Sequence, residues 1–122
     1  MRILIVEDNL KMRELLRAFL TDMAEVSECA DGDEALVAFN NCQPDWVLMD
    51  VQMQRVGGIA ATRELKNSFP ASRVVMLSKH TDAEIREACL SAGACAYFVK
   101  DNLFSLRDFL LAEKRLTEET KC

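Results

Sequence analysis

The chain has 122 residues, of which 50% are hydrophobic and 29% are charged, a balance that indicates one globular domain over residues 1–122 and excludes a disordered chain. Twenty acidic and fifteen basic residues give a net charge of -5 without a basic cluster, so we expect no direct binding of this domain to nucleic acid. The apolar run after Met1 is too short for a signal peptide, and no segment has the length of a membrane span, so a cytoplasmic location without membrane contact is predicted.

Apolar runs mark the predicted strands. The runs 2–6, 46–50, 73–77 and 96–99 are short and almost free of polar residues, as in strands buried inside a parallel sheet. The segment 24–30 differs, because charged and hydroxyl side chains interrupt its apolar positions, and it is predicted to be an edge strand.

Amphipathic segments between these runs predict five helices. The first begins after Asn9 and turns Met12, Leu15, Leu16 and Phe19 inward, and the second follows the turn Asp31-Gly32-Asp33 and stops at Asn40-Asn41 and Pro44. The third comes after a polar loop that ends in the paired glycines 57–58, and Ile59, Leu65 and Phe69 mark it until it ends before Pro70. The fourth starts with a capping box from Thr81 to Glu84 and closes at Gly93, and the fifth runs from Leu103 into a solvated tail over 113–122. Strands that alternate with helices predict right-handed crossovers and a parallel sheet with helices on both faces.

The five cysteines are predicted to be reduced, small residues of the core. They are odd in number, contain no Cys-x-x-Cys pair and mostly fall in apolar segments: Cys29, Cys42, Cys89, Cys95 and Cys122. Trp46 begins an apolar strand and is expected to pack in the core, and its distance in sequence from Asp50 suggests that its fluorescence can report on that residue. His80, the only histidine, is expected to be solvated.

Charged and polar residues directly follow four of the strands. Glu7 and Asp8 follow the first, Asp50 ends the third, Ser78 follows the fourth and Lys100 follows the fifth. In open parallel sheets these carboxyl ends form one rim where ligands bind. Three carboxylates that meet there would repel one another unless a hard cation such as Mg²⁺ accepts their oxygens.

The same rim suits phosphoryl chemistry. Lys100 and Ser78 can each hold a phosphoryl oxygen, and with cations on two sides Asp50 is a credible nucleophile toward phosphorus. Any one of these residues taken alone is more readily explained as a solvated loop residue. The coincidence of all of them after separate strands is what favours a site.

These residues also carry a family resemblance. The stretches Ile3-Leu4-Ile5-Val6-Glu7-Asp8-Asn9, Val47-Leu48-Met49-Asp50-Val51-Gln52-Met53 and Tyr97-Phe98-Val99-Lys100 resemble the receiver domain of bacterial response regulators in two-component signalling, over essentially the whole chain. The resemblance implies a flavodoxin-like (βα)5 three-layer sandwich, with a five-stranded parallel sheet in the order 2-1-3-4-5.

The resemblance also implies roles for single residues. Asp50 would be phosphorylated by a sensor histidine kinase or phosphotransfer protein, and Mg²⁺ would be held by Glu7, Asp8, Asp50 and the backbone carbonyl of Gln52. Ser78 and Lys100 would contact the acyl phosphate, and Tyr97 would change rotamer with the switch, although Tyr97 could also be a plain core residue. Gln52 and Lys79, which flank the acceptor, would tune the hydrolysis rate.

The expected output is a protein switch that catalyses its own phosphorylation and dephosphorylation. It would act through the surface of the fourth helix, fifth strand and fifth helix, which would bind a downstream protein target or output domain or pair two copies. Two positions depart from the family pattern: Gln54 stands where a proline is frequent, and Asp101 stands where a proline usually follows the lysine, which leaves the isomer of the Lys100–Asp101 bond open.

Four other readings stay open. An aspartyl-phosphate phosphatase would carry Asp-x-Asp, whereas Val51-Gln52 follows Asp50 here. A flavin carrier would have a Ser/Thr-rich phosphate loop in place of Glu7-Asp8. The chain could also be a pseudo-receiver that binds a partner without phosphorylation, or the receiver part of a longer DNA-binding transcriptional regulator.

Overall fold

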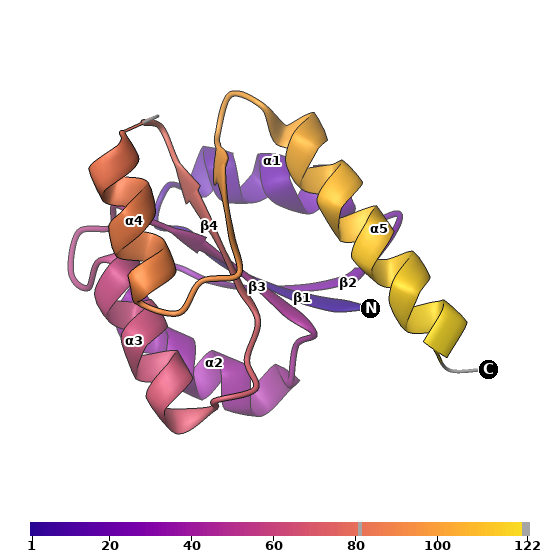
Figure 1. The fold of residues 1–122 in the computed structure, drawn as a ribbon, viewed down its shortest axis with the longest axis horizontal. Helices are drawn as coiled ribbons and strands as arrows, with labels where there is room; N and C mark the ends of the chain where they lie inside the picture. Colours follow the sequence, from indigo (N-terminus) through magenta and orange to yellow (C-terminus); the bar gives the residue numbers. More distant parts are fainter. Residues whose placement is uncertain (81, 121–122) are drawn as a thin grey trace.

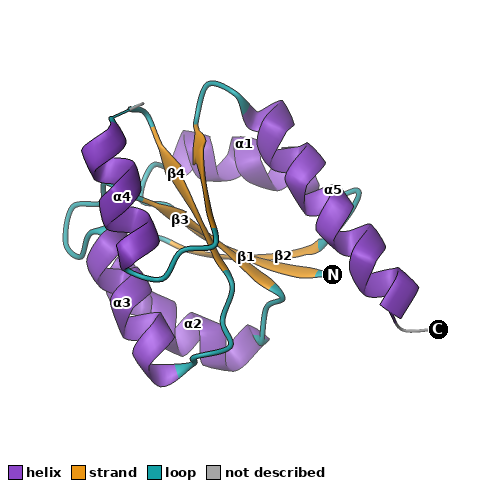
Figure 2. Ribbon diagram, viewed as in Figure 1, coloured by secondary structure: helices purple, strands orange, loops and turns teal. Residues whose placement is uncertain are grey.

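A five-stranded parallel sheet lies between two layers of helices (Figures 1 and 2). The structure is a computed structural model that describes residues 1–80 and 82–120. Its strands are β1 (Arg2–Val6), β2 (Glu25–Cys29), β3 (Trp46–Asp50), β4 (Val74–Ser78) and β5 (Ala96–Val99). Its helices are α1 (Leu10–Leu20), the short 3-10 helix η1 (Gly32–Glu34), α2 (Ala35–Cys42), α3 (Gly58–Ser68), α4 (Ala83–Ser91) and α5 (Leu103–Thr120).

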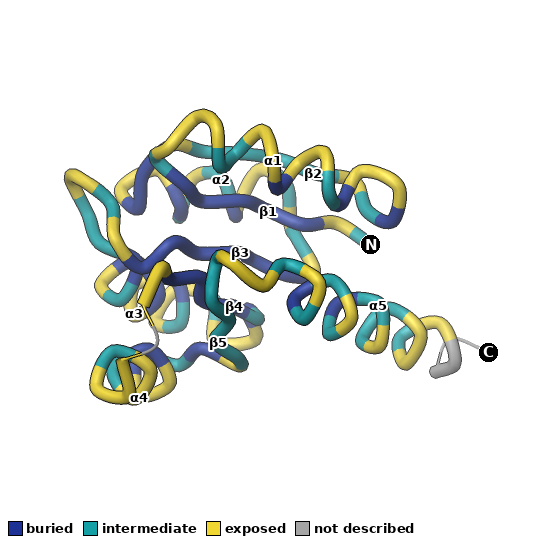
Figure 3. The backbone as a smooth tube through the Cα atoms, turned by 90° about the horizontal axis from the view of Figure 1, so that it is seen from above, coloured by how far each residue is buried: buried dark blue, intermediate teal, exposed yellow. Residues whose placement is uncertain are grey.

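The strand order is β2-β1-β3-β4-β5, which confirms the predicted 2-1-3-4-5 sheet. Helices α1 and α5 cover one face, and α2, α3 and α4 cover the other (Figure 1). Successive residues of a strand point to opposite faces, so Leu4 packs against α2, α3 and α4, while Ile3 and Ile5 pack against α1 and α5. Because β1, β3 and β4 are buried on both sides, nearly every position in them must be apolar (Figure 3).

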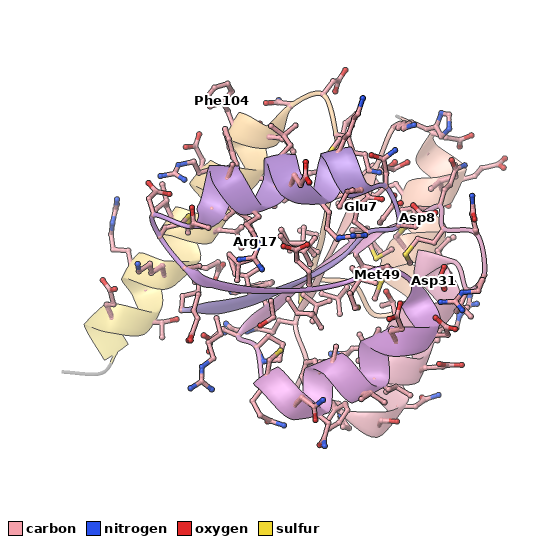
Figure 4. The ribbon with its side chains drawn as sticks, turned by 180° about the vertical axis from the view of Figure 1, so that it is seen from behind. Glu7, Asp8, Arg17, Asp31, Met49 and Phe104 are labelled. Atoms are coloured by element: carbon pink, nitrogen blue, oxygen red, sulfur yellow. The ribbon has the colours of Figure 1, made fainter. Side chains whose placement is uncertain are left out.

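Strand β2 lies at the edge of the sheet, as predicted, and pairs only with β1 among the described strands. Its Glu28 accepts a hydrogen bond from Arg13 Nε at 3.0 Å and another from Arg17 Nε. Figure 4 shows Arg17 on α1, facing this strand. Burial pushes the pKa of Glu28 upward, but the two guanidinium groups outweigh it and bring the pKa below its usual range. These pairs fasten α1 to the polar edge.

One prediction for α1 was wrong, whereas the predicted end of α2 is confirmed. Leu15 was expected to face inward from α1, but it is 49% exposed, and the buried positions are Leu16 and Leu20. Helix α2 was predicted to stop at Asn40-Asn41 and Pro44, and it ends at Cys42, between these residues; Gln43 follows in the left-handed conformation with φ 48°. A residue with positive φ cannot continue a right-handed helix, so the backbone of Gln43 ends α2.

The last two helices also differ from expectation. The N-cap of α4 is Asp82, whose Oδ1 accepts from Glu84 N–H at 2.8 Å, and the first residue of the predicted capping box, Thr81, lies outside the described residues. Gly93 closes this helix with φ +111°, as predicted. Residues after 113 were expected to form a solvated tail, but α5 continues as a helix to Thr120 and its end extends away from the sheet (Figures 1 and 3).

The cysteine prediction holds for only part of the set. Cys89 is fully buried, Cys29 and Cys42 are partly buried, and all three are free thiols. Burial raises the pKa of Cys29 to about 12, so this thiol is a poor nucleophile. Cys95 is exposed, which contradicts its predicted core position, and Cys122 lies outside the described residues.

Trp46 packs in the core as predicted, with Phe109 edge-on at 5.3 Å and the Arg73 guanidinium over its ring at 4.6 Å. However, it begins β3 whereas Asp50 ends it. At about 3.3 Å per residue the two lie about 13 Å apart, so Trp46 is badly placed to report events at Asp50. In the part of the chain that the structure describes, no helix combines the length and the apolar character needed to cross a membrane.

Candidate functional site

The predicted rim residues lie together at the carboxyl ends of the strands, around a cavity of about 430 Å³. Strand β1 leads into Glu7 and Asp8, β3 ends at Asp50, β4 ends at Ser78, and Lys100 follows β5. Figure 4 shows Glu7 and Asp8 close to each other at this end of the sheet. Because all strands are parallel, four separate segments deliver their polar ends to the same place.

Three carboxylates form the centre of the site. One oxygen from each of Glu7, Asp8 and Asp50 lies within 4.8 Å of the others. Two oxygens on opposite sides of one Mg²⁺ are about 4.2 Å apart, so small side-chain rotations would bring this set to a shared ion. Carboxylate oxygens are the ligands that such a hard cation prefers, and the donor set therefore fits it.

The Lys100 ammonium ties two of these acids together. Its Nζ lies 2.7 Å from Glu7 Oε1 and 2.9 Å from Asp50 Oδ1, and its side chain is only 8% exposed. Glu7 and Asp50 are likewise 2% and 4% exposed. With one cation among three carboxylates, the cluster keeps a surplus of negative charge that a divalent ion would offset.

The pKa shifts follow from this crowding. Burial, together with the hydrogen bond and charge of Asp50, raises the pKa of Glu7 above its usual range, against the opposing pull of Lys100. Burial alone would lower the pKa of Lys100, but the bonds to Glu7 and Asp50 outweigh it and raise that pKa. The ammonium therefore stays charged beside the acids.

Ser78 connects this site to Tyr97. The buried Ser78 Oγ accepts a hydrogen bond from His80 N–H at 3.1 Å, and the His80 carbonyl accepts a hydrogen bond from the Tyr97 hydroxyl. Tyr97 does not line the cavity and is partly buried against the α2–α4 layer. The His80 side chain is exposed, as expected. A displacement of residues 78–80 would thus reach Tyr97 directly.

The residues predicted to tune the site lie at its mouth. Gln52 and Lys79 are exposed and line the cavity, and Gln52 N–H approaches Asp50 Oδ1 at 3.4 Å. Among the described residues every peptide bond is trans, which includes Lys100–Asp101.

Several residues of the site escaped sequence reasoning. Lys11, Met12 and the exposed Leu15 extend the cavity along α1. Gly58 packs directly on Asp50, although the sequence pattern places the glycine pair 57–58 only in a polar loop. Asp31 had been read only as a turn residue, yet it is buried and bonds to the loop after β3. Its neighbours in sequence carry no signal for that contact.

We expect Gly58→Ala to destabilise the protein and distort the Asp50 loop. A Cβ at Gly58 would lie 2.0 Å from the Asp50 carbonyl oxygen and 2.9 Å from its carbon, so α3 would have to move. Overpacking of this kind costs about 1–3 kcal/mol in the free energy of unfolding, which urea denaturation measures. Gly57→Ala is the matched control, because its nearest contact is Val51 O at 3.6 Å. Equal stability of the two variants would contradict the close contact at Gly58.

The fold and this pocket define a doubly wound α/β protein with a cluster of carboxylates at the carboxyl ends of its strands. The family model described as the response regulator receiver domain matches residues 3–109 of the chain. The protein therefore belongs to the response regulator receiver domain family.

Curated relatives and solved structures agree with this assignment. The chain is 38% identical over 104 residues to the uncharacterized transcriptional regulatory protein YhcZ of Bacillus subtilis, covering 83% of the chain and 49% of YhcZ. It is 34% identical over 122 residues to the response regulator MprA of Mycobacterium avium, covering 99% of the chain and 53% of MprA. The chain thus spans about half the length of the curated relatives it matches.

Two solved receiver structures have nearly the same fold. The BeF3-activated N-terminal receiver domain of Klebsiella pneumoniae RstA matches with a TM-score of 0.83 and 26% identity, covering 95% of this chain and 97% of that one. The response regulator domain of Thermotoga maritima CheB matches with a TM-score of 0.82 and 26% identity, covering 95% of this chain and 94% of that one.

Proposed function

We propose that residues 1–122 act as one receiver domain of a two-component phosphorelay, which accepts a phosphoryl group on Asp50 in a Mg²⁺-dependent reaction. One observation carries the proposal: Asp50 lies in a buried rim with two further carboxylates, and Lys100 bridges it to Glu7. An aspartate in a solvated loop would be neither buried nor paired with a buried lysine. Family membership supports the same reading.

The residues have separable tasks in phosphoryl transfer. An Asp50 carboxylate oxygen forms a bond to phosphorus while the bond between phosphorus and the donor histidine nitrogen breaks. The leaving nitrogen takes a proton from solvent, so an acyl phosphate is left on Asp50 and a neutral histidine on the partner. Glu7, Asp8, Asp50 and the Gln52 carbonyl would hold Mg²⁺, which would offset charge on the phosphoryl oxygens. Lys100 Nζ lies 2.9 Å from Asp50 Oδ1, so it can reach an oxygen of a phosphoryl group bonded to Asp50.

The acyl phosphate is then lost to water, which cleaves the bond between phosphorus and the Asp50 oxygen and releases inorganic phosphate. Gln52 and Lys79 flank the mouth of the cavity, where the attacking water would enter, and they would set this rate. This domain would therefore catalyse its own phosphorylation and dephosphorylation.

The proposed switch runs from Ser78 to Tyr97. Phosphorylation adds negative charge and acceptor oxygens beside Ser78. If Ser78 Oγ turns to donate to the phosphoryl group, it draws residues 78–80 with it, and the bond between the Tyr97 hydroxyl and the His80 carbonyl is broken. Tyr97 would then change rotamer and alter the α4–β5–α5 surface.

That surface is the proposed point of output. It would bind a protein target or output domain, or pair two copies of the receiver, after a sensor histidine kinase or phosphotransfer protein has supplied the phosphoryl group. Relatives such as YhcZ bear names that describe transcriptional regulators, and the chain matches about half of each. A DNA-binding output domain in the whole protein is therefore included in the proposal, with no nucleic-acid contact through the receiver itself.

Intact-mass measurement tests the proposal. We expect incubation with acetyl phosphate and Mg²⁺ to add one phosphoryl group, and incubation with acetyl phosphate and a chelator to add none. Hydroxylamine should remove the group, because it attacks the carbonyl of an acyl phosphate but spares a serine phosphate. If Mg²⁺ binds and no phosphoryl group is ever added, the receiver is a phosphorylation-independent binding module, and the proposed chemistry is wrong.

A further inference from the structure

The buried Asp31 carboxylate fastens a loop that lies far from it in the sequence. Asp31 Oδ1 accepts a hydrogen bond from Val56 N–H at 2.9 Å, and Oδ2 accepts one from Arg55 N–H at 3.1 Å. Oδ1 also accepts from Asp33 N–H at 3.3 Å, which caps η1. The side chain therefore joins the turn after β2 to the loop between β3 and α3.

This loop continues into the acidic site. Gln54 N–H donates to Asp8 Oδ2 at 3.2 Å, one residue before the two amides that Asp31 holds. Three consecutive backbone N–H groups are thus shared by two carboxylates, Asp31 on one side and Asp8 on the other. Figure 4 shows Asp31 at the same end of the sheet as Glu7 and Asp8.

The packing around Asp31 leaves little room for another loop position. A Cβ on Gly32 would lie 2.6 Å from the Val56 carbonyl oxygen and 2.9 Å from Ala61 Cβ, so the turn and the loop are in direct contact. Asp31 is only 3% exposed. Burial pushes its pKa upward, but the N–H groups of Val56, Arg55 and Asp33 outweigh this and keep the pKa below its usual range.

The link to Asp8 depends on the residue at position 54. A proline, which is frequent there in the family, has no N–H and could not donate to Asp8. In this chain Gln54 supplies that donor, and Asp31 keeps the donor in place through the next two amides. Hydrogen bonds to ligating carboxylates orient them, and their loss typically weakens metal binding about 10- to 100-fold.

We propose that Asp31 is a positioning residue of the cation site: it holds the loop after β3 so that Gln54 N–H orients the Asp8 carboxylate. The inference rests on the proposed function, because it concerns the same Mg²⁺ site. Asp31 itself touches neither the ion nor the phosphoryl group.

The experiment compares Asp31→Asn with Asp33→Asn in the full chain. Both remove one negative charge close to the site, but only the first replaces an oxygen that accepts a loop N–H with an NH2 group, which cannot accept. Asp33 is 40% exposed and pairs with the Arg55 guanidinium. Titration calorimetry with MgCl2 gives the dissociation constant, and amide hydrogen exchange of residues 54–56 is measured in metal-free protein. Asp31→Ser, which keeps a cap for η1 and is too short to reach residues 55 and 56, serves if Asp31→Asn does not fold.

We expect Asp31→Asn to weaken Mg²⁺ binding about tenfold and Asp33→Asn to change it less than about twofold. Exchange at Gln54, Arg55 and Val56 should accelerate only in the Asp31 variant, which a general loss of stability would not reproduce. Wild-type affinity in Asp31→Asn, or equal effects of the two variants, overturns this inference alone. A wild-type protein that binds no Mg²⁺ overturns the proposed metal site and this inference with it.

Discussion

Replacing Asp50 with asparagine is expected to abolish phosphoryl uptake. The asparagine amide has no anionic oxygen to attack phosphorus. Among the described residues, Lys100 pairs with only two carboxylates, Asp50 and Glu7. Intact mass after incubation with acetyl phosphate and Mg²⁺ should show the wild-type adduct and none above the metal-free background in Asp50→Asn. Removing the nucleophile eliminates the covalent route rather than slowing it.

Asp108→Asn is the control for this substitution. Asp108 is exposed on α5, so its substitution removes the same charge at a position away from the rim. Its phosphoryl uptake should match that of the wild type. An adduct of wild-type yield in Asp50→Asn would mean that another residue is the acceptor, and peptide mapping would then identify it.

Replacing Lys100 with methionine is expected to cause the largest loss of stability in the site. Breaking a buried ion pair leaves its partner charge uncompensated, and here two partners, Glu7 and Asp50, are 2% and 4% exposed. Such losses are about 3–5 kcal/mol. Urea denaturation of metal-free protein should therefore give a free energy of unfolding lower by about 3 kcal/mol, and Mg²⁺ should restore part of it by compensating the same carboxylates.

Lys79→Met is the control for this loss of stability, because Lys79 lines the same cavity but is exposed. Its unfolding free energy should change by less than about 1 kcal/mol, since exposed charges are screened by water. If Lys100→Met is as stable as Lys79→Met without metal, Lys100 does not stabilise the fold by offsetting the buried charges of Glu7 and Asp50.

Local sequence patterns predicted the elements and the chemistry of the rim. Buried parallel strands require uninterrupted apolar runs. The run that ends at Asp50 and the run that Ser78 follows therefore revealed both the strands and their polar residues. β4 proved to be shifted by only one residue, to Val74–Ser78. The edge position of β2 was readable from its polar residues, whereas the full strand order came from the resemblance to a family.

The tertiary structure decided which of these residues touch. Periodicity describes the faces of a single element, but it carries no information on distances between elements. Hence the Lys100 bridge to Glu7 across 93 residues, the Asp31 bonds across 24 and 25 residues, and the contact of Gly58 with the Asp50 backbone were invisible in the sequence. The residue types of the site were therefore set by the sequence alone, whereas their geometry depends on how the crossovers bring distant strand ends and loops together.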